Sequence, residues 1–226
     1  MSRKIAIIVA SGTGSRMQNQ IPKQFLPLRG RPVLVHTLEK FMALTDCEII
    51  LALSDPGFSY WKPIALQYFP DTPITVVRGG ETRFHSVKNA LAAIGGDENA
   101  LVAVHDGVRP FVSVKTLLDT FNAAENFGVA VACVDCKDSV RRIEGEKNSA
   151  LERGTIKLVQ TPQAFRLSVL REAYKVSYRE HFTDDASVAE FSGYTVHLVE
   201  GSYSNIKITT PEDLAMGEVL LDFSGA

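Results

Sequence analysis

Two glycines and two cations stand close together near the amino terminus, in the stretch from Ser11 to Lys23. Gly12 and Gly14 are separated by one residue, and Arg16 and Lys23 follow them. Glycine lets a backbone approach a ligand closely, and successive backbone N–H groups in such a turn form an anion-binding concavity. The combination indicates a site for a highly charged phosphate chain. The alternative is a plain strand-to-helix turn with surface cations, because a G-x-G pattern alone is common.

This glycine loop differs from two familiar phosphate-binding motifs. No Gly-Lys-Ser/Thr follows at the spacing of a Walker loop. The third glycine of a dinucleotide fingerprint is also absent, because Met17 stands in its place.

Three further charged residues could act on a phosphate. Asp106 directly follows a predicted strand, where a carboxylate beside a phosphate loop can bind Mg²⁺ together with substrate oxygens. Arg109 is one turn further on and could hold a second anion. Lys207 alternates with Ile206 and Ile208 and therefore faces away from them. The alternatives are a turn aspartate, a solvated loop arginine and a solvent-facing strand lysine.

Other reactive residue types do not form a recognisable site. Cys133 and Cys136 form a single C-x-x-C pair with no second pair, and alternation within the preceding strand explains Cys133 as a core residue. The histidines are scattered, and no G-x-S-x-G motif occurs. The run Thr183–Asp185 is most simply a helix start, with a hydroxyl cap and acids near the positive end.

Strand-like and helix-like runs alternate over most of the chain. Strands are predicted at 5–10, 48–53, 74–77, 101–104 and 129–134, and helices at 32–44, within 57–69, at 82–94 and at 114–127. This order predicts an α/β fold, a Rossmann-like and mostly parallel sheet flanked by helices. Ligands of such sheets bind beyond the carboxyl ends of the strands. The loops at 11–23, 78–83 and 105–110 should therefore lie together.

The alternation stops after Cys136. Residues 139–160 mix short apolar pairs with charge, and the polar centre at 144–149 looks like a hairpin tip. The segment has too few apolar residues to anchor itself in the sheet, so we expect a protruding β-arm that lies on the surface or reaches a partner chain. Helices near 167–178 and 184–191, strands at 195–199 and 205–208, and a helix at 211–221 follow. Because the sequence contains no recognisable linker segment, we expect one domain over 1–226.

The overall composition narrows the class of protein. The 226 residues are 45% hydrophobic and 22% charged, with a net charge of −2. That charge argues against a nucleic-acid partner bound through a broad basic face. The six mostly aliphatic residues at 5–10 are too few for a signal-peptide core, and no run of about 18 apolar residues occurs. We expect a cytoplasmic protein with no membrane partner.

Eight short segments, in order along the chain, resemble one known family. They are GTGSRM…PKQFLPL at 12–28, PVLVHTLEKF at 32–41, GGETRFHSV at 79–87, HDGVRPF at 105–111, KDSV at 137–140, QTPQAF at 160–165, TDDAS at 183–187 and NIKIT–PEDL at 205–214. These segments make the chain similar to the 2-C-methyl-D-erythritol 4-phosphate cytidylyltransferases of the non-mevalonate isoprenoid pathway.

The resemblance implies a nucleotidyltransferase reaction and assigns residues to it. The phosphate of 2-C-methyl-D-erythritol 4-phosphate would attack the α-phosphorus of CTP, releasing pyrophosphate and forming 4-CDP-2-C-methyl-D-erythritol. Catalytic positions match Arg16, Lys23, Arg153 and Lys207; nucleotide-binding positions match Ala10, Ser11, Gly12, Thr13, Gly14, Gly80, Glu81, Ser86 and Asp106; contacts to the sugar phosphate match Arg109, Ser139, Thr161 and Thr183.

The resemblance also implies a metal and a partner. Asp106 matches the ligand of Mg²⁺ or another divalent cation. The hairpin, at about 137–160, would be a dimerisation arm exchanged across a homodimer, so that Arg153 would act in the neighbour's site. Departures from the family pattern occur at Val9, Ser11, Glu81, Ser139 and Ser204 and concern contacts to base and sugar.

Other functions remain open on the residues alone. A ribitol 5-phosphate cytidylyltransferase shares several of the segments, although the TDDAS run and Arg83-x-x-Ser86-Val87 resemble the erythritol enzyme more. A sugar-nucleotide pyrophosphorylase with another base is a broader alternative. A non-catalytic nucleotide-binding module is disfavoured by the combination of Arg16, Lys23, Asp106 and Lys207.

Overall fold

The chain alternates between strands and helices as far as residue 135, in the predicted order. The computed structural model describes residues 2–12, 17 and 19–224. The elements of this part are β1 (Lys4–Ala10), the 3₁₀ turn η2 (Lys23–Phe25), β2 (Pro27–Leu28), β3 (Arg31–Pro32), α1 (Val33–Met42), β4 (Cys47–Leu53), α2 (Asp55–Tyr68), β5 (Ile74–Arg78), α3 (Arg83–Ala92), β6 (Leu101–Asp106), α4 (Val114–Phe127) and β7 (Val129–Asp135).

A hairpin arm and a shorter run of helices complete the chain. The later elements are β8 (Arg141–Glu144), β9 (Lys147–Ala150), η3 (Arg153–Thr155), β10 (Lys157–Arg166), α5 (Leu167–Ala173), α6 (Asp185–Phe191), β11 (His197–Glu200) and α7 (Pro211–Ser224). Within the described residues, none of the helices has the length and apolar character needed to span a bilayer.

A mixed sheet forms the centre of the molecule. In the part of the chain that the structure describes, its seven strands run in the order β11-β7-β10-β6-β1-β4-β5. Strand β1 pairs in parallel with β4 and β6, whereas β10 runs antiparallel to both of its neighbours. The predicted α/β fold with a mostly parallel sheet is therefore confirmed.

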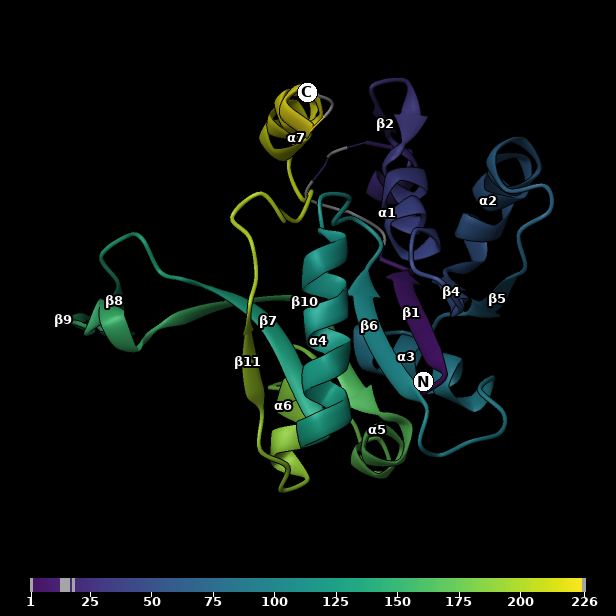
Figure 1. The fold of residues 1–226 in the computed structure, drawn as a ribbon. Helices are drawn as coiled ribbons and strands as arrows, with labels where there is room; N and C mark the ends of the chain where they lie inside the picture. The colour runs from purple at the N-terminus through teal and green to yellow at the C-terminus, as the bar shows by residue number, and fades with distance from the viewer. Residues whose placement is uncertain (1, 13–16, 18, 225–226) are drawn as a thin grey trace.

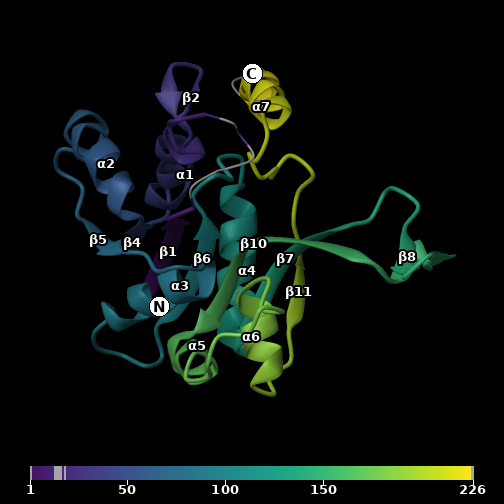
Figure 2. The ribbon, with the colours of Figure 1, turned by 180° about the vertical axis from the view of Figure 1, so that it is seen from behind.

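Helices cover both faces of this sheet. Helices α1, α2 and α4 pack on one face against alternate residues of β1, including Ala6 and Ile8 (Figure 1). Helices α3, α5 and α6 pack on the other face, against Ile5 and Ile7 (Figure 2). Because successive side chains of a strand point to opposite faces, a continuous apolar run such as β1 fills both layers.

Strand β10 was not expected from the sequence, and it lies inside the sheet between β6 and β7. Residues 157–160, which seemed too polar to join the sheet, form its beginning, and 157–159 pair with β7. Its centre carries Gln160, Thr161 and Gln163, all buried. Their hydrogen bonds to other segments allow this burial, since a paired polar group can be buried at little cost. The hydrophobic pattern of the sequence does not reveal such a strand, because its central residues are polar.

The prediction of a strand at 205–208 was wrong. The segment makes no sheet ladder and instead runs past the loop that follows β6. The backbone N–H of Ile208 donates to the carbonyl of Val108 at 2.9 Å. Ile208 also packs in a small cluster with Leu28, Val33, Val108 and Phe111. This cluster therefore fixes the segment beside the carboxyl ends of the strands.

The predicted hairpin is present at the tip of the polar segment. Strands β8 and β9 pair with each other, from Arg141 opposite Ala150 to Glu144 opposite Lys147. All residues of both strands are exposed, and Ile143 is 75% exposed. The hairpin extends away from the body of the molecule in both views (Figures 1 and 2).

Candidate active site

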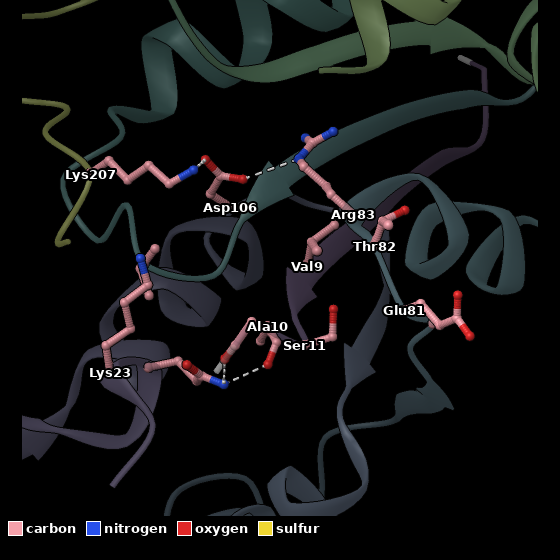
Figure 3. A pocket seen from close by; sticks show the side chains of 13 residues that line it. Val9, Ala10, Ser11, Lys23, Glu81, Thr82, Arg83, Asp106 and Lys207 are labelled. Carbon is pink, nitrogen blue, oxygen red and sulfur yellow. Dashed lines mark hydrogen bonds and ion pairs between the residues drawn. The ribbon is translucent and has the colours of Figure 1, made fainter. Parts of the chain in front are cut away.

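The three loops that the sequence placed together do meet beyond the carboxyl ends of β1, β5 and β6. They line a cavity of about 210 Å³, here called the first cavity. Its lining residues are Val9, Ala10, Ser11, Gly12, Lys23, Gln24, Gly80, Glu81, Thr82, Arg83, Asp106, Val108 and Lys207 (Figure 3).

Buried hydrogen bonds fix the entrance to the glycine loop. The side-chain amide of Gln24 donates to the carbonyl oxygens of Ala10 at 2.7 Å and Gly12 at 3.2 Å. The Ser86 hydroxyl donates to the Thr82 carbonyl and accepts from the N–H of Gly80. Since its single proton is thus used, the Ser11 hydroxyl, 2.8 Å away, is the donor to Ser86. Ser86 therefore lies behind the cavity wall and holds Ser11 and Gly80 in place.

Close packing at the same wall requires a glycine. A Cβ atom at position 79 would lie 2.5 Å from the Cβ of Ser11 and 3.0 Å from the Oγ of Ser86. The Gly79 N–H also donates to the carbonyl of Leu53 at 2.7 Å, so the loop has no room to move back. The backbone of the 78–83 loop can therefore reach the glycine loop only without a side chain at this position.

Asp106, the last residue of β6, is surrounded by cations. Its carboxylate lies 2.9 Å from Lys207 Nζ, 3.4 Å from Arg109 Nε and 3.5 Å from Arg83 Nε. Lys207 and Arg83 approach it from opposite sides (Figure 3). Burial alone would raise the pKa of Asp106, but the charges of Arg83, Lys207 and Arg109 outweigh it and hold the pKa well below its usual range. The carboxylate is therefore ionised at neutral pH.

A hydrogen-bond chain fixes the backbone of Asp106. Its N–H donates to Thr161 Oγ1 at 3.1 Å, and that oxygen lies 3.1 Å from His105 Nδ1. His105 Nε2 lies 3.1 Å from the carbonyl of Arg109, which can only accept. The proton of the neutral imidazole therefore sits on Nε2, and Thr161 donates to Nδ1. Burial lowers the pKa of His105 to about 4, which keeps the ring in this neutral form.

A second cavity, of about 240 Å³, adjoins the first. It is lined by Arg83, Asp106, Arg109, Val159, Gln160, Thr161, Gln163, Thr183, Asp184 and Lys207. Arg83, Asp106 and Lys207 line both cavities. A carboxylate with its cations therefore stands at the junction, where two ligands could meet.

The structure brings most of the predicted site residues to these two cavities. Ala10, Ser11, Gly12, Lys23, Gly80, Glu81, Asp106 and Lys207 line the first, and Arg109, Thr161 and Thr183 line the second. Ser139 and Arg153 lie on the arm, exposed, and line neither cavity. Thr13, Gly14 and Arg16 lie outside the described residues.

Four residues of the site escaped the interpretation of the sequence. Gln24, His105 and Arg83 lie in or beside the predicted loops, and Asp185 lies at a predicted helix start. Each acts through a partner in another segment of the chain. The resemblance offered a signal for all four, since each lies in a matching segment. In the part of the chain that the structure describes, no group of three or more His, Cys, Asp or Glu side chains is arranged to hold a metal ion.

Known proteins of similar sequence cover nearly the whole chain. The family model of IspD, 2-C-methyl-D-erythritol 4-phosphate cytidylyltransferase, matches residues 4–222. A protein of that name from Phocaeicola vulgatus is 46% identical, over 98% of this chain and 100% of its own length. Another from Bacteroides thetaiotaomicron is 44% identical, over 97% of this chain and 100% of its own length.

Solved structures agree with this assignment. A 4-diphosphocytidyl-2C-methyl-D-erythritol synthase from Anaerococcus prevotii superimposes with a TM-score of 0.83 at 32% identity, covering 98% of this chain and 99% of that one. A 2-C-methyl-D-erythritol 4-phosphate cytidylyltransferase from Thermus thermophilus gives a TM-score of 0.76 at 32% identity, over 98% and 100% of the two chains. The full-length match in sequence and the shared fold establish that the chain belongs to the 2-C-methyl-D-erythritol 4-phosphate cytidylyltransferase family.

Proposed function

We propose that this protein transfers the cytidylyl group of CTP to 2-C-methyl-D-erythritol 4-phosphate and releases pyrophosphate. The observation that carries the proposal is the shared wall of the two cavities, which Asp106, Arg83 and Lys207 line on both sides. Each cavity would take one phosphate-bearing ligand. A family of cytidylyltransferases supplies the identity of those ligands.

The first cavity is the proposed site of the nucleotide. Ser11, Gly12, Gly80 and Glu81 would surround the cytidine, and Lys23 lies where it could neutralise the triphosphate. Negative charge on the leaving pyrophosphate grows in the transition state, and fixed cations stabilise it there because they need no reorganisation. Arg16 has the same expected role, and Thr13 and Gly14 are expected to bind the nucleotide; all three lie outside the described residues.

The second cavity is the proposed site of the acceptor. A phosphate oxygen of the acceptor would form a bond to the α-phosphorus of CTP, and the bond from that phosphorus to the oxygen bridging to the β-phosphorus would break. Both reactants are anionic, so Arg109 and Lys207 would hold the acceptor against the repulsion between them. Thr183 is exposed on the cavity wall, whereas the Thr161 hydroxyl is already bonded to Asp106 and His105.

The donor set around Asp106 fits a divalent cation only together with the nucleotide. Asp106 supplies one buried carboxylate, and the side chains nearest to it are cations. Mg²⁺ commonly binds through one or two carboxylates plus substrate phosphates, and Asp106 would be that carboxylate. The cation, when bound, would neutralise phosphate charge. This requirement stays a prediction, as does a cytoplasmic location.

We further propose a homodimer in which the arm at about 137–160 completes the acceptor site of the partner. Ser139 and Arg153 are exposed and line neither cavity of their own chain, and the β8–β9 hairpin between them extends away from the body of the molecule (Figure 1). The apolar side chain of Ile143 is 75% exposed at the tip of the hairpin. A partner subunit would bury it and would receive Arg153 beside its own acceptor.

An assay of pyrophosphate release tests the reaction. Each common nucleoside triphosphate is combined with 2-C-methyl-D-erythritol 4-phosphate or ribitol 5-phosphate, with Mg²⁺ or with a chelator. We expect release with CTP, the erythritol phosphate and Mg²⁺. Release only when ribitol 5-phosphate is the acceptor would reject 2-C-methyl-D-erythritol 4-phosphate as the substrate. Binding of CTP with no release for any acceptor would favour a non-catalytic nucleotide-binding module.

A further inference from the structure

A buried ion pair connects the two cavity walls. Arg83 Nη2 lies 2.6 Å from Asp185 Oδ2, and the Asp185 side chain is 0% exposed. On its other side the same guanidinium faces Asp106, with Nε 3.5 Å from Oδ1. Arg83 therefore stands between a fully buried carboxylate and the carboxylate at the junction of the cavities.

Both members of this pair occupy equivalent places in the fold. Arg83 is the first residue of α3, and Asp185 is the first residue of α6. The loop before α3 contributes Gly80 and Glu81 to the first cavity, and the loop before α6 contributes Thr183 and Asp184 to the second. The ion pair thus joins the starts of two helices whose preceding loops line different cavities.

Contacts around Asp185 leave it little freedom. The Tyr174 hydroxyl donates to Asp185 Oδ1 at 2.6 Å. Arg83 Nη2 and Asp185 Oδ2 are both buried, and neither has a hydrogen-bond partner among the other described residues. Each charge therefore depends on the other, because an uncompensated buried charge is strongly unfavourable.

The loop before α6 has a second anchor, which a control can use. The Gln163 amide donates to Asp184 Oδ2 at 2.8 Å and accepts from the N–H of Ala186 at 2.9 Å. Asp184 also caps the helix through the N–H of Ser187. The helix start is therefore held to β10 independently of Arg83. What the ion pair adds is the link to α3 and to Asp106.

We propose that Arg83 is a positioning residue: fixed by Asp185, it sets the distance between the loop that holds the nucleotide and the loop that holds the acceptor, and it orients Asp106 between them. The inference rests on the proposed function, because it assumes two reacting ligands in adjoining cavities. A misplacement of reacting groups by about 1 Å is enough to lower turnover roughly 100-fold.

The test uses variants that remove the link without leaving an unpaired buried charge. Arg83→Gln/Asp185→Asn removes both charges of the pair together, and the new Asn oxygen can still accept from Tyr174. The Gln amide nitrogen takes the place of Arg83 Nε, which faces Asp106, but the side chain ends two bonds short of Nη2 and no longer reaches residue 185. The matched control is Arg31→Gln/Glu39→Gln, which neutralises a surface ion pair between β3 and α1. The measurements are the melting temperature, the Kd of Mg²⁺–CTP by calorimetry, and kcat and KM for the acceptor.

We expect the Arg83→Gln/Asp185→Asn protein to melt close to the wild type and to bind Mg²⁺–CTP within about threefold, but to lose at least about 30-fold in kcat. Arg83→Lys, which keeps the charge without the two-sided guanidinium, should fall between this variant and the wild type. The surface control should retain kcat within about twofold.

Two results would overturn the inference. The first is a folded double variant whose kcat is within about threefold of the wild type. The second is a Kd for CTP that rises in proportion to the loss of activity, because Arg83 would then act in nucleotide binding and not in positioning. If the double variant does not fold, Arg83→Lys decides instead: it keeps the positive charge without the two-sided guanidinium, and an unchanged kcat contradicts the proposal. Failure of the wild type to release pyrophosphate would reject the proposed function itself.

Discussion

The ammonium nitrogen of Lys207 lies 2.9 Å from Oδ2 of Asp106, although the two residues belong to segments far apart in the chain. The neighbour of Lys207 explains this contact. Ile208 is fully buried and its N–H donates to the carbonyl of Val108, so Lys207 must point the other way, into the two cavities. The contact makes the segment at 205–208 part of the site rather than part of the sheet.

Replacement of Lys207 tests its role toward the acceptor. We expect Lys207→Ala to lower kcat/KM for the acceptor by at least about 100-fold, the scale of losing one fixed charge-stabilising group. Folding should hardly change, because Arg83 and Arg109 still face Asp106. Steady-state pyrophosphate release measures the effect, and Lys62→Ala, an exposed lysine on α2, is the control. Equal losses in both variants would contradict the assignment.

Lys23 tests the site of the triphosphate. It lines the first cavity, at the start of η2 and beside the buried Gln24 (Figure 3). We expect Lys23→Ala to lower turnover by at least about 100-fold, or about 2.7 kcal/mol of transition-state stabilisation. Single-turnover pyrophosphate release separates this loss from weaker binding. A decrease of less than about threefold would remove Lys23 from the mechanism.

Gly79 tests the packing between the two loops of the nucleotide site. In Gly79→Ala the added Cβ would lie 2.5 Å from the Cβ of Ser11, so that Ser11 must move. Such overpacking costs about 1–3 kcal/mol, and we expect the Kd of CTP to rise at least about tenfold. Calorimetry measures it. Gly95→Ala is the control, since nothing lies within 4 Å of a Cβ there. A Kd equal to that of the control would show that the loop tolerates the side chain.

His105 makes the stability of the fold depend on pH. Burial lowers the pKa of its ring from 6.5 to about 4 in the folded protein, so between these values the unfolded chain binds the additional proton. The stabilisation is therefore complete above pH 6.5 and is lost as the pH falls toward 4. The loss amounts to at most about 3 kcal/mol, at 1.36 kcal/mol per unit of pKa.

Urea unfolding at about pH 7, 5.5 and 4.5 measures this dependence, because these pH values span most of the interval between the pKa of an ordinary histidine and the lowered pKa of His105. We expect His105→Gln to have a shallower slope of unfolding free energy against pH than the wild type. The control is His181→Gln, at an exposed position. If the wild type and His105→Gln lose stability in parallel, His105 is not the source of the slope.

The arm is tested by mixing two inactive chains. Arg153→Ala and Lys23→Ala proteins are unfolded, mixed and refolded together, so that hybrid dimers form. If Arg153 acts in the partner's site, one of the two sites in each hybrid has both residues intact, and part of the activity returns. Hybrids isolated with two different affinity tags that show no more activity than their parents would count against a shared site.

Local patterns in the sequence determined most of the fold. The apolar run of β1 and the helical periodicity of α4 are properties of neighbouring residues, so they could be recognised without any tertiary information. The same holds for the glycine loop and for the acid that follows β6. From their order alone it follows that the loops after β1, β5 and β6 converge at one edge of a parallel sheet.

Which polar residues are buried, and which partners they contact, depends on how distant segments pack together. Strand β10 carries polar residues that no hydrophobic pattern would place inside a sheet, yet hydrogen bonds from distant segments satisfy them there. Arg83 and Asp185 looked like ordinary helix-start residues until the fold brought the starts of α3 and α6 together. The physical reason is that hydrophobic periodicity is a local property of the chain. A buried charge or hydrogen-bonding group is stable only with a partner, and that partner can come from a distant segment that local patterns do not identify.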